Sequence, residues 1–285
     1  MALALLFGLA TALANAAALI TQHIASTRSP TPPRGIGLVA FLFRQPLWLA
    51  GWVALAGSLI FQTLALHFGP LALVQPLLVG ELVLALLIRR LCLGQAISGR
   101  AWTAAGFTSL GLTGFLILAS PSAGSEPSTT RWFWSGLLCL IIVGMALLVG
   151  WHGSPARRAA AFALATAVLW ATEATLIKAV GDQWSRVGLG GMVTHWPLYA
   201  FIVVGVAGLV CEQTALHVGP LGVSQPVIVL ADPLASVLLG VSLFHETLRS
   251  GLLSRGGIVL LLLATGWFAL ELMRQTPDTM EATLI

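Results

Sequence analysis

The chain has 285 residues, of which 58% are hydrophobic and only 8% are charged. Soluble domains carry about 25% charged residues, so this composition excludes an ordinary water-soluble domain. The formal net charge of +4 comes from arginines that lie between apolar segments. That distribution argues against nucleic-acid binding and predicts an all-α polytopic membrane protein, whose direct partner is the lipid bilayer.

Nine segments are long and apolar enough to cross a bilayer as helices, which takes about 20 residues each. The first lacks the basic residues of a secretory signal and matches a later span, so we expect it to be retained as a helix. Loops rich in Pro or Ser follow the first and fourth spans, and a polar tail covers residues 276–285. The predicted spans are residues 3–25, 46–68, 70–90, 101–119, 132–151, 159–180, 196–217, 220–243 and 253–273.

Two stretches of the chain nearly repeat each other. The sequence ALHFGPLALVQP at residues 65–76 returns as ALHVGPLGVSQP at residues 215–226. Each stretch joins two spans through a Gly-Pro pair, and we expect Gly to close one helix and Pro to open the next. Each pair of spans is therefore predicted to form a tight helical hairpin.

The repeat divides the chain into two four-helix halves with one connecting helix. Equivalent spans lie five apart, an odd number, so the second half is expected to be inserted upside down, as in many secondary transporters. The predicted units are residues 1–120 (first repeat), 121–157 (connecting span), 158–275 (second repeat) and the polar tail.

Loop arginines predict the orientation of the chain, because basic residues favour the cytoplasmic side. Nine basic residues fall on the side of the tail and five on the other. We therefore expect an external N-terminus and a cytoplasmic C-terminus, in the cytoplasmic membrane of a bacterium.

A run of residues in the last two spans carries a family resemblance. Pro233, Gly240, Glu246, Gly256 and Gly266 resemble the P…G…E…G…G pattern of the drug/metabolite transporter superfamily with EamA-like repeats. The resemblance implies a secondary transporter of a small metabolite or exported compound. The chain departs from many relatives in having nine predicted spans instead of ten, and in having Gln95 at the first-repeat counterpart of Glu246.

The pattern around Pro70 and Pro76, together with nine spans, also resembles the NIPA-type magnesium transporter branch. Mg²⁺ takes octahedral oxygen ligands and dehydrates reluctantly, so converging carboxylates would suit its passage. This resemblance implies a divalent-cation transporter as an alternative, with metal ligands that the sequence does not identify.

Carboxylates inside predicted spans are the strongest candidates for function, because ionisable groups in the bilayer are costly. Glu81 and Asp232 lie near the centres of equivalent spans, 151 positions apart. We expect them to bind substrate or a coupling ion; the alternative is a protonated, hydrogen-bonded structural role. Glu173, in the sixth span, is a third candidate. Pro233 can break its helix beside Asp232 or only shape its packing.

Polar uncharged residues in the spans supply further candidates. Gln75 and Gln225 occupy equivalent positions before a proline, and Asn15 lies in the first span. Buried amides usually hydrogen-bond between helices, and on a cavity wall they would also orient a polar ligand. We include all three in the candidate binding site.

Three further residues are candidates for gating. Glu212 lies in the last turns of the seventh span, where contact with lipid headgroups is the competing interpretation. His67 and His217 precede the two hairpin turns, where a structural role competes with proton relay. Lys178 is expected to extend its ammonium group to the membrane interface.

The sequence contains no nucleotide-binding loop, nucleophile constellation or zinc spacing. We therefore expect neither an enzyme nor an ATP-driven pump, and no cofactor. The favoured hypothesis is a secondary transporter working by alternating access, coupled to a proton or cation. A magnesium transporter and a non-transporting membrane scaffold or lipid-handling subunit are the alternatives, and a homo-oligomer is left open.

Overall fold

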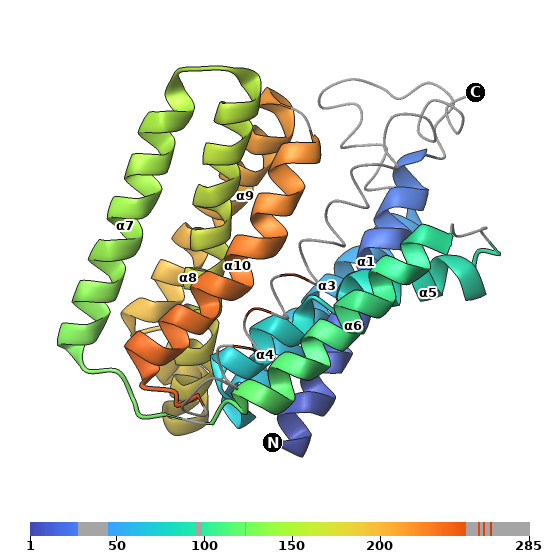
Figure 1. The fold of residues 1–285 in the computed structure, drawn as a ribbon. Helices are drawn as coiled ribbons and strands as arrows, with labels where there is room; N and C mark the ends of the chain where they lie inside the picture. The colour runs from blue at the N-terminus through green and yellow to red at the C-terminus, as the bar shows by residue number, and fades with distance from the viewer. Residues whose placement is uncertain are drawn as a thin grey trace.

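The computed structural model describes residues 1–27, 45–94, 99–122, 124–219 and 221–248, with single positions at 256, 259 and 263. Within these ranges the chain is almost entirely helical (Figure 1). The helices are α1 (Ala2–Thr27), α3 (Pro46–Phe68), α4 (Leu71–Leu78), α5 (Glu81–Leu91), α6 (Gly99–Ala119), α7 (Thr129–Trp151), α8 (Pro155–Met192), α9 (Trp196–Val218) and α10 (Leu221–Phe244).

The first eight predicted spans each coincide with helical structure. Six described segments are long and apolar enough to cross a membrane, and α1 and α6 contain shorter apolar stretches. The chain is thus a helical, polytopic membrane protein. The ninth predicted span and the polar tail lie outside the described ranges, apart from three single positions, so the count of nine stays a prediction.

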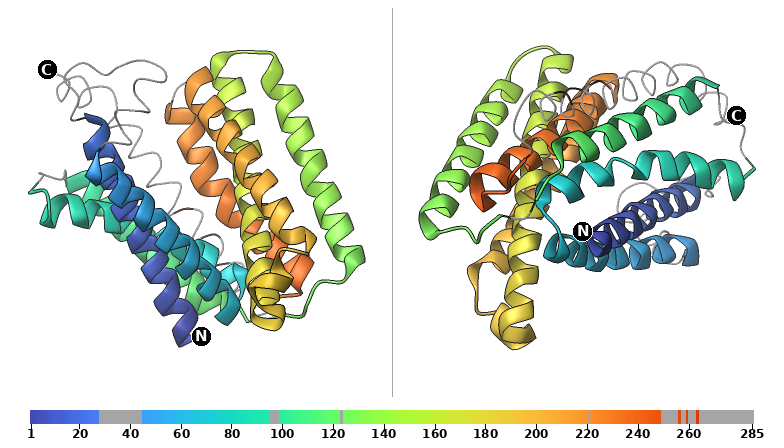
Figure 2. Two further views of the ribbon diagram at one scale, coloured as in Figure 1. Left: turned by 180° about the vertical axis from the view of Figure 1, so that it is seen from behind. Right: turned by 60° about the horizontal axis from the view of Figure 1, so that its bottom comes forward.

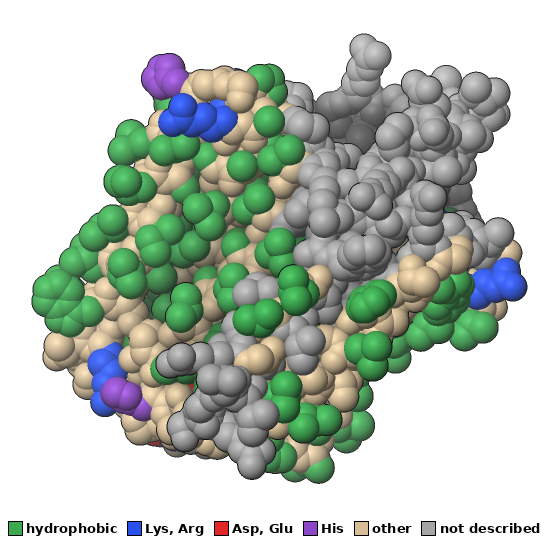
Figure 3. All heavy atoms as spheres, viewed as in Figure 1, with side chains coloured by type: hydrophobic (Ala, Val, Ile, Leu, Met, Phe, Trp, Pro, Cys, Tyr) green, Lys and Arg blue, Asp and Glu red, His purple; other side chains and the backbone are tan. Residues whose placement is uncertain are grey.

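The outer face of the helices is apolar. Val53, Leu110 and Leu148 are each at least 70% exposed. In Figure 3, hydrophobic side chains are spread over the described part of the visible face, and the basic side chains lie toward its ends. Exposed leucines and valines in this number suit contact with lipid chains instead of water.

The helices form two groups that meet near one end. One group contains α1 and α3 to α6, and the other contains α7 to α10 (Figures 1 and 2). Contacts of α10 with α4 and of α8 with α3 join the groups. Away from the end at which α4 lies, the two groups diverge.

Equivalent helices of the predicted repeats run in opposite directions. In Figure 1, α1 begins at the lower end of the molecule, whereas α8 begins at the upper end and descends. Each packs against its successor in the repeat: α1 against α3, and α8 against α9. This antiparallel arrangement is the geometry that an inverted duplication requires.

The glycines of the two hairpins allow the chain to pack closely against neighbouring helices. Gly69 and Gly219 follow α3 and α9 directly, as expected, and have extended backbones (φ −148° and −162°). A Cβ atom on Gly69 would lie 2.5 Å from the Cβ of Ala4, near the start of α1. A Cβ atom on Gly219 would lie 2.3 Å from the carbonyl oxygen of Pro155, at the start of α8. Both glycines therefore let a hairpin press against the first helix of its own half.

The predicted third span is interrupted. α4 ends at Leu78, and α5 begins at Glu81. Pro76 cannot donate a backbone hydrogen bond, and Gly80 lowers the helix propensity of the same turn. The N–H groups of Val79 and Gly80 instead bond to the carbonyls three residues earlier, at 3.2 and 3.0 Å. This break places Glu81 in the first turn of a new helix.

Candidate functional site

A cavity of about 520 Å³ lies between the two helix groups. Residues from α1, α3, α4 and α5 line one side of it, and residues from α8, α9 and α10 line the other. This volume is in the range of small-molecule sites, which are about 300–1,000 Å³. The cavity is therefore large enough for an organic molecule.

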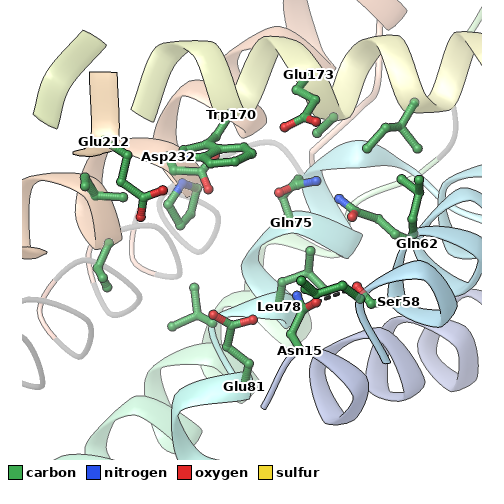
Figure 4. Close-up of a pocket in the computed structure, with 18 residues that line it drawn as sticks. Asn15, Ser58, Gln62, Gln75, Leu78, Glu81, Trp170, Glu173, Glu212 and Asp232 are labelled. Atoms are coloured by element: carbon green, nitrogen blue, oxygen red, sulfur yellow. Dashed lines mark hydrogen bonds between the residues drawn. The ribbon is translucent and has the colours of Figure 1, made fainter. Parts of the chain in front are cut away.

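All four carboxylates of the predicted spans line this cavity. Each comes from a different helix: Glu81 from α5, Glu173 from α8, Glu212 from α9 and Asp232 from α10. Figure 4 shows their side chains around one common space. Acidic residues that lie up to 151 positions apart in the sequence are thus brought together.

All of the described charged side chains that line the cavity are acidic. Glu81 is repelled by Glu212, and Asp232 is repelled by both Glu81 and Glu173. None of the described residues that line the cavity is Lys, Arg or His. Carboxylates without a basic partner gain stability from a bound proton or cation, so the cavity favours positive species.

An amide and a hydroxyl extend the polar wall near Glu81. Asn15 of α1 lines the cavity near the Glu81 carboxylate (Figure 4). The hydroxyl of Ser58, on α3, donates to Asn15 Oδ1 (Figure 4). Polar groups of α1, α3 and α5 therefore share this wall of the cavity.

Gln75 is the most unusual polar side chain of the cavity. It is 5% exposed, and among the described residues its Nε2 atom has no hydrogen-bond partner. In Figure 4 its amide points into the central space. A buried donor without a partner costs about 1–3 kcal/mol, so the site is incomplete until an acceptor reaches it.

Asp232 lies beside a proline, but its helix does not break. α10 is continuous from Leu221 to Phe244, so Pro233 leaves the helix intact. Ser236, one turn later, donates from its hydroxyl to Asp232 Oδ1 at 3.2 Å. The interruption that the sequence analysis considers beside Asp232 occurs instead in the other half, before Glu81.

A second polar cluster joins the two groups at the end where α4 begins. The buried carboxylate of Glu246 accepts the backbone N–H groups of Leu71 at 2.5 Å and Ala72 at 2.8 Å. Lys178 Nζ lies 3.2 Å from Glu246 Oε1 and donates to the carbonyl of Gly69 at 3.0 Å. Glu246 thus caps α4 across the interface, and Lys178 neutralises it. We call these groups the Glu246 cluster.

The segment between α6 and α7 packs on the same end. Ser122 and Thr247 exchange backbone hydrogen bonds of 2.9 and 3.3 Å, and Ser125 donates to the carbonyl of Phe244 at 2.7 Å. A Cβ atom on Gly124 would lie 2.0 Å from the Phe244 carbonyl oxygen, so only glycine permits this approach. The halves are therefore fastened together on this side of the cavity.

Two sequence interpretations need correction. Glu212 lines the cavity, whereas headgroup contact was the competing expectation. Lys178 does not extend to the interface: its side chain is only 12% exposed, because it pairs with Glu246. Pairing across the interface depends on tertiary contacts that helical spacing does not reveal.

Of the candidate histidines and Gln225, only the His67 side chain belongs to the described set. His67 is exposed, with Nδ1 3.2 Å from Asp182 Oδ1, and is not among the residues that line the cavity. Gln225 belongs to α10 and His217 to α9, but their side chains are outside the described set. Their predicted roles stay predictions.

Three residues of the cavity wall were not among the predicted site residues: Ser58 and Gln62 on α3, and Trp170 on α8. Ser58 and Gln62 lie one turn apart, on one face of an apolar helix, which is a detectable signal. Trp170 sits well inside its span, away from the interface where tryptophans usually gather.

Comparison with known proteins gives one informative similarity. The chain is 28% identical over 247 residues to an uncharacterized protein of Corynebacterium glutamicum, which covers 86% of this chain and 85% of that protein. No family model matches the chain, and no solved structure resembles it significantly.

Proposed function

We propose that the protein is a secondary membrane transporter, in which the two helix groups alternate access to the carboxylate-lined cavity. The observation that carries this proposal is the shared cavity, which takes acidic residues from both halves of a helical membrane protein. Sites near the interface of inverted repeats are the usual substrate sites of such transporters.

The carboxylates supply a means of coupling. Repelling acids without a basic partner release and bind protons or cations as their access to water changes. Glu81 and Asp232 lie on opposite walls, so movement of one group relative to the other alters their separation. We therefore assign to them the binding of the coupling proton or cation.

The Glu246 cluster supports a moving interface. It joins α4 of one group to α8 and to the segment that follows α10 by polar contacts. Buried apolar residues of α3, α4, α8 and α10 pack beside it. The polar contacts can be exchanged for others as the groups move, whereas the apolar residues beside them would have to slide or separate. In an alternating-access cycle they would hold one side of the cavity closed and part when that side opens.

The spread of the carboxylates favours an organic substrate over a bare divalent cation. Among the described residues, no group of three His, Cys, Asp or Glu side chains is close enough to hold a metal ion. A Mg²⁺ ion stripped of its waters would need several oxygen ligands from the protein at about 2.1 Å, which requires convergence. An organic cation or a proton makes no such demand.

The test uses proteoliposomes that contain a trapped pH-sensitive dye and the purified full chain. A panel of amines, amino acids and organic anions is added, with and without a proton gradient. We expect at least one compound to drive a proton flux that protein-free liposomes lack. Glu81→Gln and Asp232→Asn should abolish the flux while the protein stays folded, whereas Arg157→Gln in a loop should not.

Equal fluxes from the two amide variants and the parent protein would show that these carboxylates are structural. Absence of any compound-dependent proton flux or compound accumulation would contradict transport itself.

A further inference from the structure

We propose that the cavity selects small organic cations that carry one hydrogen-bond-accepting oxygen: an ammonium group, an apolar or aromatic body, and a hydroxyl or carbonyl. The inference rests on the proposed function and names the substrate class of the same site. It draws on three features of the cavity wall: its charge, its apolar portion and its unpaired donor.

The charge of the wall requires a cation. Glu81, Glu173, Glu212 and Asp232 all line the cavity, and no described lining residue is basic. The nearest described lysine, Lys178, is held by Glu246 and the carbonyl of Gly69. An anionic ligand would meet only repulsion there, whereas an ammonium group can pair with a carboxylate.

The apolar portion requires a body larger than a metal ion. Trp170 and Leu78 line the cavity together with the carboxylates (Figure 4). An indole face attracts cations and packs against aromatic rings. About 520 Å³ also exceeds what one ammonium ion fills, so a ligand with a carbon body occupies more of the cavity.

The unpaired donor requires an oxygen on the ligand. Gln75 Nε2 is buried, points into the cavity and has no partner among the described residues. It lies on α4, whereas Glu173 and Asp232 lie on the opposite wall. A ligand that spans the two walls would place its ammonium group at the carboxylates and its oxygen at Gln75.

Four matched probes test this class by calorimetric titration of the full chain in detergent at neutral pH. Phenylethanolamine carries the ammonium and the hydroxyl, and phenethylamine lacks the hydroxyl. 2-Phenylethanol lacks the charge, and 3-phenylpropanoate reverses it. We expect phenylethanolamine to bind about fivefold more tightly than phenethylamine, because one hydrogen bond contributes about 1 kcal/mol. The alcohol and the anion should not bind measurably.

Substitutions test which residue makes each contact with the ligand. Gln75→Leu should remove the fivefold preference between the two amines, while Gln213→Leu, an exposed glutamine on α9, should retain it. Asp232→Asn and Glu173→Gln should weaken both amines about tenfold, whereas the exposed Glu126→Gln should not. Gln75→Met provides a second probe of the amide if the leucine variant fails to fold.

Tight binding of 3-phenylpropanoate, or an unchanged preference in both Gln75 variants, would overturn the inference. The binding experiment does not depend on transport. A wrong substrate class can therefore be told apart from a wrong proposed function. Amines that bind but are never transported would contradict the transporter. Proton-coupled transport of an anion, with no amine binding, would contradict the substrate class alone.

Discussion

Glu246 shows how one carboxylate can serve two helices at once. It accepts two backbone N–H groups at the start of α4 and pairs with Lys178 of α8, although it follows α10 in the chain. The first N–H groups of a helix need outside acceptors, and a negative charge also favours the N-terminal end of the helix dipole. The side chain is wholly buried, so no water can replace these bonds.

Glu246→Gln should therefore destabilise the protein strongly. The amide cannot accept both N–H groups and leaves the Lys178 ammonium without its counter-charge. Removal of one partner of a buried pair costs on the order of 3 kcal/mol. We expect the Tm in detergent, followed by circular dichroism, to fall by roughly 10 °C.

The control for this substitution is Glu126→Gln, which removes an exposed ion pair with Arg186. Exposed pairs contribute little, so its Tm should stay near that of the parent. Equal Tm values for the two variants would show that the Glu246 cluster does not stabilise the interface.

At the scale of the elements, the two halves differ where the sequence predicts them to be alike. Pro76 and the nearby Gly80 interrupt the first-half span, whereas Asp232-Pro233 leaves α10 continuous. A proline removes one helical bond in either case, but a glycine in the same turn also removes the intrinsic preference for helix. The sequence alone does not weigh these two effects against the packing of neighbouring helices.

Pro76→Ala should straighten the span of α4 and α5, because alanine restores the bond to the Ala72 carbonyl and removes the clash of the proline ring with it. Glu81 would then turn away from its position beside Asn15. We expect the proton flux in proteoliposomes to fall about tenfold, with the Tm unchanged within a few degrees.

The matched control is Pro197→Ala in the first turn of α9, where a proline removes no helical bond. It should retain the parent flux. If Pro76→Ala transports at the parent rate, the break before Glu81 has no part in transport.

Much of the architecture is predictable at this scale, and some of the site is not. Apolar length locates eight helical spans, one of which contains both α4 and α5, and the duplicated Gly-Pro stretches locate both hairpins. The cavity carboxylates could be named because acids are rare in apolar spans. The partners of Lys178 and the cavity position of Glu212 could not, because each depends on the rotation of a helix against distant neighbours. The unpaired amide of Gln75 likewise appears only once the helices are assembled.

At the scale of the molecule, the predicted orientation places the Glu246 cluster outside. The loop arginines predict an external N-terminus, and α1 begins at the same end of the molecule as the Glu246 cluster (Figure 1). The structure would then be fastened on its external side. The orientation itself rests on the count of loop arginines.

Residues on either side of α7 test that orientation. Thr130 and His152 are both exposed and flank the apolar length of this helix. In a background with Cys92, Cys139 and Cys211 replaced by alanine, Thr130→Cys should react with a membrane-impermeant maleimide on intact cells. His152→Cys should react only after the cells are permeabilised. The reverse pattern would invert the orientation, and labelling of both from one side would show that α7 does not span.

In the proposed transport cycle, the two helix groups move against each other around the carboxylate-lined cavity. A reversible lock tests this movement most directly. Ser122 follows α6 of one group and Thr247 follows α10 of the other. They exchange backbone hydrogen bonds, and their hydroxyl groups are in contact. In the cysteine-free background, Ser122→Cys and Thr247→Cys can be oxidised to a disulfide and later reduced.

The measurement is the proton flux of this double variant, driven by a compound that the parent transports, before oxidation, after it and after reduction. We expect oxidation to stop the flux and reduction to restore it, while amine binding in detergent persists throughout. A fully oxidised protein that transports as fast as the reduced one would contradict alternating access at this cavity.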